Sequence, residues 1–144
     1  MVFYGSWKIE KKTKAGMLVY TFGYQGRDPR ELLALARRKD AVVVDVRYSP
    51  RSRNPRWNRR MLEKVLGERY VWIREFGNKN YATGGRIKLV DFAAGVVKLN
   101  SLQYNCCILL CQEADPDKCH RKVVARMLNR QGFVYLGELK GRAR

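Results

Sequence analysis

Residues 41–46 read Ala-Val-Val-Val-Asp-Val, a β-branched run with a single acid near its end. A second apolar run, Cys-Cys-Ile-Leu-Leu-Cys, occupies residues 106–111. A strand with one face in water alternates polar and apolar residues, whereas a strand buried on both faces is apolar throughout. The first run therefore predicts a strand that is covered on both faces, and the second run predicts a further strand of a mostly parallel sheet.

Strand and helix patterns alternate on either side of these runs. Further strands are predicted at residues 17–22, 70–73 and 133–136, and helices near 57–66 and 87–99. Two more helices are expected to begin at Asp28-Pro29 and Asp115-Pro116, because an acid at the N-cap and proline at the first helical position favour a helix start.

We expect one α/β domain over residues 1–144, with basic N- and C-terminal tails. The alternation predicts a three-layer Rossmann-like or flavodoxin-like fold with a mostly parallel sheet of about five strands. Residues 74–86 are rich in Gly and Asn and lack periodicity, which makes them a candidate site loop. The helix near 57–66 is expected to bury one side of its surface: Trp57, Met61, Leu62, Val65 and Leu66.

The chain is strongly basic, with 30 Lys and Arg against 13 Asp and Glu and a formal net charge of +17. A compact chain with this charge repels itself, and a polyanionic partner relieves the repulsion. Six arginines and no acid lie between residues 47 and 60, and guanidinium groups bind phosphates bidentately. We therefore expect a nucleic acid partner, with DNA favoured over RNA; a generally basic chain, an acidic membrane surface and a small anion are the alternatives.

No apolar run approaches the ~18 residues of a membrane-spanning helix. The first residues, Met-Val-Phe-Tyr-Gly-Ser-Trp-Lys, do not have the pattern of a secretory signal, so a cytoplasmic location and no membrane partner are expected. Disulfides are then not expected among the four cysteines. The sequence does not indicate an oligomeric state.

Polar residues follow the predicted strands at the edge where ligands bind in parallel sheets. Asp45 ends one strand, Glu113 follows another, and His120 lies in the first turn of the next helix. These three are the predicted catalytic residues, since carboxylates and histidine carry out general acid–base chemistry. The alternatives are that Asp45 pairs with Arg47, that Glu113 only complements a helix N-terminus, and that His120 is structural.

The residues expected to contact nucleic acid are basic or aromatic and lie in or beside the same loops: Tyr24, Arg27, Arg47, Arg51, Arg53, Arg56, Trp57, Arg59, Arg60 and Arg121. Stacking of a base on an aromatic ring contributes about 1–3 kcal/mol. Tyr48 and Tyr81 lie in these loops as well. The spacing of Trp57 to Met61 fits burial in the core equally well.

Cys111, Cys119 and His120 raise the question of a metal site. Their spacing is not that of a recognised zinc motif, and a neighbouring Cys and His on one helix do not easily face the same ion. We therefore expect no metal and no cofactor. Cys119 at a helix N-terminus, between basic neighbours, favours a thiolate, so a reactive cysteine stays open.

Three motifs occur in order along the chain. They are Thr-Phe-Gly-Tyr-Gln-Gly-Arg at residues 21–27, Asp-Val-Arg-Tyr-Ser-Pro-Arg-Ser-Arg at 45–53, and Leu-Cys-Gln-Glu-Ala-Asp-Pro at 110–116 followed by Cys-His-Arg at 119–121. With them the chain resembles, over roughly residues 17–136, the uncharacterised family catalogued as domain of unknown function 488. The resemblance implies a Rossmann-like fold and a shared polar site. Arg-Glu-Phe-Gly at residues 74–77 departs from the Pro-Glu-Leu-Gly more usual in that family, but keeps Glu75 and Gly77.

These features together predict a DNA-binding hydrolase of repair type that cleaves the N-glycosyl bond of a modified or damaged base. In such an enzyme a carboxylate activates water and loop aromatics receive a flipped base. Three alternatives stay open: a nucleic-acid-binding module without catalysis, a metal-dependent nuclease, and a cysteine-based sulfurtransferase.

Overall fold

The computed structural model describes residues 16–113 and 119–140. Within them lies a five-stranded sheet of order β3-β2-β4-β1-β5, in which every neighbouring pair is parallel. The strands are β1 (Leu18–Gly23), β2 (Val42–Asp45), β3 (Tyr70–Trp72), β4 (Cys106–Cys111) and β5 (Val134–Glu138). The α-helices are α1 (Pro29–Lys39), α2 (Arg59–Leu66), α3 (Phe92–Asn100) and α4 (Arg121–Arg130). None of these helices is long and apolar enough to cross a bilayer.

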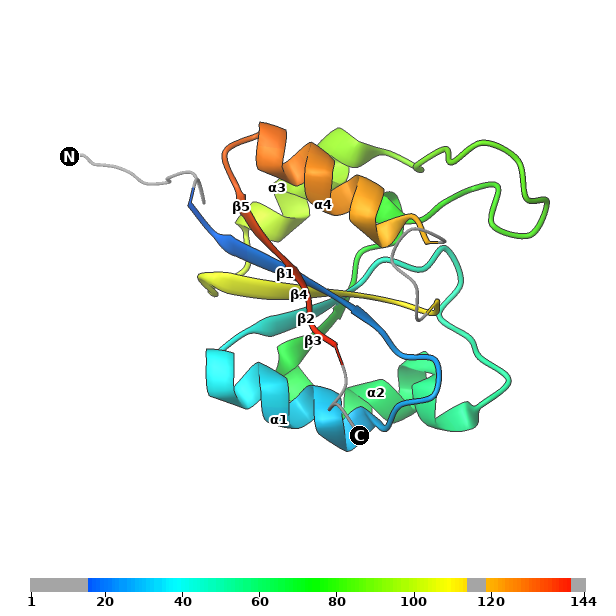
Figure 1. Ribbon diagram of the computed structural model, residues 1–144, viewed down its shortest axis with the longest axis vertical. Coiled ribbons are helices and arrows are strands. Elements are labelled where there is room, and N and C mark those ends of the chain that lie inside the picture. The colour runs from blue at the N-terminus through cyan, green and yellow to red at the C-terminus, as the bar shows by residue number, and fades with distance from the viewer. Residues whose placement is uncertain (1–15, 114–118, 141–144) are drawn as a thin grey trace.

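The sheet is the middle of three layers, with α1 and α2 on one face and α3 and α4 on the other (Figure 1). The first face packs Leu32 of α1 and Leu62 of α2 against alternate residues of β2 and β4. The second packs Leu99 of α3 and Val124 of α4 against the remaining ones. All residues of β2 and β4 are buried, as their unbroken apolar runs predicted. The predicted three-layer α/β fold is confirmed.

At the carboxyl end of β4, connections that lead to opposite faces of the sheet lie next to one another. Helices α1 and α2, which follow β1 and β2, cover one face, while α4, which follows β4, covers the opposite face (Figure 1). Strand β4 lies between β2 and β1 in the sheet. The loops that follow β1 and β2 therefore lead to one face of the sheet, and the loop that follows β4 leads to the other face. A crevice opens at such switch points, and it is where ligands bind in open α/β sheets.

The helix starts show where the sequence pattern was accurate. Helix α1 begins at Pro29, and the Asp28 side chain accepts a hydrogen bond from the amide of Arg30 at 2.8 Å, as expected for an N-cap. Helix α4 is described from Arg121; the predicted start at Asp115-Pro116 lies outside the described residues.

Two expectations for the other helices are wrong. Helix α3 begins at Phe92 rather than near residue 87, because the Asp91 side chain caps the amide of Ala94 and residues 88–90 pair their backbone with residues 77–79. Helix α2 begins at Arg59, after a short 3-10 helix (Pro55–Trp57). In α2 the buried residues are Leu62 and Leu66, and Met61 is 38% exposed instead of buried.

Candidate active site

A cavity of about 170 Å³ lies at the carboxyl ends of β2 and β4. Its lining comes from the segments that follow β2, β3 and β4: Arg47, Tyr48, Asn78, Tyr81, Cys111, Gln112, Glu113, Cys119 and His120. Segments far apart in the sequence therefore meet at one edge of the sheet. Of the three predicted catalytic residues, Glu113 and His120 line this cavity, whereas Asp45 is buried behind it.

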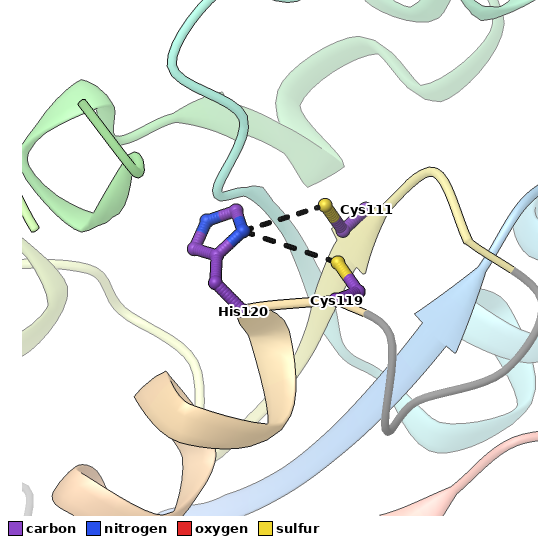
Figure 2. A group of neighbouring side chains, drawn as sticks. All are labelled: Cys111, Cys119 and His120. Atoms are coloured by element: carbon purple, nitrogen blue, oxygen red, sulfur yellow. Dashed lines mark hydrogen bonds between the residues drawn. The ribbon is translucent and has the colours of Figure 1, made fainter. Parts of the chain in front are cut away.

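Cys111, Cys119 and His120 form a compact cluster in the wall of the cavity (Figure 2). The Nδ1 atom of His120 lies 3.7 Å from the sulfur of Cys111 and 3.9 Å from the sulfur of Cys119. Cys111 is the last residue of β4, and His120 is the N-cap of α4. The strand end and the helix start thus bring the three side chains together, and the expectation that Cys119 and His120 would not face a common point is wrong.

The ring of His120 is held in one orientation. Its Nε2 lies 2.7 Å from the carbonyl oxygen of Val46, so Nε2 carries a proton and donates it to that oxygen. In the neutral ring the other nitrogen, Nδ1, then carries a lone pair, and this is the atom that faces the two sulfurs.

The two thiols shift each other's pKa in opposite directions. A hydrogen bond from Cys111 lowers the pKa of Cys119 far below that of an ordinary thiol, and His120 lowers it further, against the effect of burial. The same hydrogen bond, together with burial, raises the pKa of Cys111. The pair is therefore arranged to hold one thiolate, on Cys119, next to one neutral thiol.

Asp45 forms a buried network with Arg47 and Tyr70. The Arg47 guanidinium donates two hydrogen bonds to the Asp45 carboxylate, at 2.8 and 2.6 Å, and the Tyr70 hydroxyl donates a third at 2.5 Å. A fourth comes from the backbone amide of Arg47 at 3.1 Å. Since Asp45 has no exposed surface, its carboxylate has all its acceptor sites occupied by the protein, in the way that the structural alternative described. It holds Arg47 at the cavity wall.

Gly23 lies against the loop that carries Glu113, beside the buried Arg121. The buried Arg121 guanidinium makes two hydrogen bonds to Glu138, at 3.1 and 2.8 Å, and the amide of Gly23 donates to the same carboxylate. A Cβ atom at position 23 would lie 1.9 Å from the carbonyl oxygen of Glu113, so only glycine fits there. Sequence reasoning missed Glu138, which lies at the end of the last strand with no motif around it.

The predicted nucleic-acid ligands fall into two groups. Four are buried within the protein: Tyr24, Arg47, Trp57 and Arg121. Tyr24 and Trp57 stack on each other with ring centroids 4.8 Å apart. Arg27 is largely covered, pairs with Glu31 and donates to the carbonyl of Leu139 at 2.7 Å. These five side chains are engaged in packing and internal hydrogen bonds.

The other five predicted ligands are exposed: Arg51, Arg53, Arg56, Arg59 and Arg60. Arg56 pairs with Asp28 and Arg59 with Glu63, but no acidic partner is found in the described part of the chain for Arg51, Arg53 or Arg60. A second hollow, of about 430 Å³, lies beside them and has Arg53, Trp57 and Gln112 in its lining. Gln112 also lines the smaller cavity, so the two hollows are neighbours.

The family comparison agrees with the motif in the loop after β2. A model of the family described as domain of unknown function DUF488 matches residues 29–86. The chain resembles this family. The match covers less than half of the chain and contains the motif at residues 45–53, whereas the motifs at 21–27 and 110–121 lie outside it. No curated protein and no solved structure matches the chain.

Proposed function

We propose that the protein is an enzyme that binds DNA and hydrolyses the N-glycosyl bond of a modified or damaged base. The observation that carries the proposal is that Glu113 lines the same cavity as Tyr48 and Tyr81, at the sheet edge that also bears the exposed arginines. A carboxylate, aromatic rings and a phosphate-binding surface are the three parts that such a reaction requires.

The two tyrosines are suited to hold a base that has left the DNA stack. Their ring centroids lie 5.6 Å apart, and Tyr81 is 59% exposed. Tyr48 is held by Arg74, whose guanidinium lies 4.5 Å from its ring centroid and donates to its hydroxyl at 2.8 Å. Enzymes that act on a base take it out of the duplex and stack it on aromatic side chains. For this purpose Tyr48 supplies a ring that Arg74 holds in place, and Tyr81 supplies a ring that is exposed to solvent.

Glu113 supplies the chemical group. The bond between base and sugar breaks with its electron pair on the leaving base, and water bonds to the sugar carbon. A carboxylate stabilises the positive charge that builds on the sugar and takes the proton of the water, and a proton from solvent neutralises the released base. Among the described residues Glu113 is the one carboxylate that lines this cavity. Cleavage of the DNA strand by a two-metal mechanism uses several carboxylates around a pair of ions, so base release is the reaction that this lining favours.

The proposal is tested with a panel of duplex oligonucleotides that each carry one damaged or methylated base. Products are weighed by mass spectrometry after incubation with the purified full-length protein. We expect a free base and an intact strand with an abasic site. Glu113→Gln should lower the turnover rate at least about 100-fold, the lower range of general acid–base contributions, without weakening DNA binding.

Glu63→Gln is the matched control, because it makes the same chemical change on the exposed side of α2, where Glu63 pairs with Arg59. It should turn over substrate at the wild-type rate. Unchanged masses across the whole panel would leave a DNA-binding module without catalysis, and a shortened strand would indicate a nuclease. Either result refutes base release.

A further inference from the structure

We propose that Cys111, Cys119 and His120 bind one zinc ion and leave its fourth position open toward the cavity that Glu113 lines. The ligand atoms of the three residues lie within 4.8 Å of one another, and all three residues line that cavity. The inference goes beyond the proposed base release and does not depend on it.

The distances fit a tetrahedral zinc ion. With Zn–S bonds of about 2.3 Å and Zn–N bonds of about 2.0–2.1 Å, a tetrahedral ion separates a sulfur from a nitrogen ligand by about 3.6 Å. The observed separations from His120 Nδ1 are 3.7 Å to Cys111 and 3.9 Å to Cys119. Both nitrogen–sulfur separations are therefore within a few tenths of an ångström of those that a tetrahedral ion requires.

The orientation of His120 is that of a metal ligand. Histidines that bind metals generally donate their other ring N–H to a carbonyl or carboxylate, which fixes the ring and leaves the ligating nitrogen unprotonated. His120 donates from Nε2 to the Val46 carbonyl at 2.7 Å and directs Nδ1 at the two sulfurs (Figure 2). The bond also ties the ring to the residue that follows β2, so the position of Nδ1 is set by the sheet.

The chemistry of the three ligands also suits a zinc ion. Cys111 and His120 are almost fully buried and Cys119 is half-buried. Binding of Zn²⁺ by a pair of thiolates releases the Cys111 proton, and two thiolates, a neutral imidazole and Zn²⁺ then sum to zero charge. Thiolate and imidazole are ligands that suit zinc, while calcium and magnesium prefer oxygen.

Sites with three protein ligands and an open fourth position are typical of catalytic zinc, which lowers the pKa of a bound water to about 7. In this chain Glu113 lines the same cavity and is available to hold or move a proton there. Arg47, which also lines the cavity, is paired with Asp45 and has no lone pair to contribute as a ligand.

Metal uptake is measured on the full-length protein without DNA, after removal of metals with a chelator under reducing conditions. Zn²⁺ is titrated in competition with a chromophoric chelator, and Co²⁺ serves as a spectroscopic probe. We expect one ion per chain, thiolate-to-cobalt charge-transfer absorption, and the intense visible bands of a tetrahedral site. Cys119→Ser and His120→Ala should each weaken Zn²⁺ binding at least about 100-fold, because loss of a group that only hydrogen-bonds a metal ligand already costs about 10–100-fold.

Cys106→Ser is the matched control, because Cys106 lies at the other end of β4 and packs in the opposite core. It should bind Zn²⁺ like the wild type. A second readout needs no variant: Zn²⁺ should protect Cys119 of the wild type from iodoacetamide, as followed by peptide mapping. Absence of cobalt charge-transfer bands, equal affinity of Cys106→Ser and Cys119→Ser, or unprotected Cys119 overturns the proposal. Since DNA is absent, failure here leaves base release untouched, and failure of base release leaves the metal site untouched.

Discussion

At the scale of single residues, the buried carboxylate of Asp45 is balanced by a defined set of donors. Arg47 supplies its guanidinium and its amide, and Tyr70 supplies its hydroxyl. Burial raises the pKa of Tyr70, and the Asp45 charge raises it further, so this hydroxyl stays protonated and donates. A buried ion pair of this kind contributes little net stability, yet removal of one partner leaves the other charge uncompensated.

We therefore expect Asp45→Asn to lower the free energy of unfolding by about 3–5 kcal/mol, because Arg47 stays buried without its counter-ion. Tyr70→Phe removes one hydrogen bond to a charged group and should cost about 1.5–3 kcal/mol. Urea denaturation followed by circular dichroism measures both values. Asp40→Asn is the control, since Asp40 is exposed and meets Arg69 on the surface. A stably folded Asp45→Asn protein that no longer releases base would instead assign Asp45 a catalytic role.

At the scale of elements, the sequence predicted what depends on local patterns. The unbroken apolar runs identified β2 and β4, because a strand buried on both faces is apolar throughout. Asp28-Pro29 identified the start of α1, because the N-cap of a helix favours particular residues. The start of α3 was missed, since it depends on the pairing of residues 88–90 with residues 77–79, which is a tertiary contact.

The candidate site divides in the same way. Strand ends could be read from the sequence, and they correctly brought Glu113 and His120 into one cavity. The sequence does not show which polar residues point into the cavity and which are buried behind it. Asp45 is an example, because it was expected in the site and is fully buried. The Cys–Cys–His cluster was discounted because its spacing matches no motif. Its geometry depends on how the end of β4 is oriented relative to the start of α4. The number of residues between the side chains does not give this orientation.

An ion pair joins the segment after β3 to α3 and has a pH dependence that can be measured. Lys98 of α3 lies 2.8 Å from Glu75, and its hydrogen bond lowers the pKa of that carboxyl below the usual 4.5. A lowered pKa means that the pair stabilises the fold above about pH 4.5 and that this contribution is lost as the pH falls through the lower value. The pair is partly exposed, so the contribution is about 0.2–1 kcal/mol.

Lys98→Met should therefore raise the pKa of Glu75 toward 4.5, because the largest cause of the shift is removed. Carbon-detected NMR titration of the Glu75 carboxyl measures this directly. Lys64→Met, a change on α2, serves as the control and should leave the titration of Glu75 unchanged. A pKa of Glu75 that does not move in Lys98→Met would show that the pair does not persist in solution.

At the scale of the whole molecule, positive charge and helix ends coincide at the carboxyl edge of the sheet. Each helix that follows a strand begins at this edge, where its N-terminus carries partial positive charge (Figure 1). Arg51, Arg53 and Arg60 add exposed guanidinium groups in the loop after β2 and at the start of α2. The cavity and the neighbouring hollow therefore open at an edge that carries both exposed guanidinium groups and helix N-termini.

This placement of charge predicts how the proposed DNA binding should respond to salt. Each phosphate neutralised by the protein adds about −0.9 to the slope of log K against log of salt concentration. Replacing Arg51, Arg53 and Arg60 by Gln should make the slope shallower by about 2.7 in fluorescence anisotropy titrations of a duplex. The control removes the same charge from the amino edge of the sheet, at Arg37, Arg38 and Arg130, which are exposed in the last turns of α1 and α4. Because both triple variants have the same net charge, equal slopes would mean that DNA binds to overall charge and not to the edge that carries the cavity. A change confined to the first variant would place the phosphates beside Glu113.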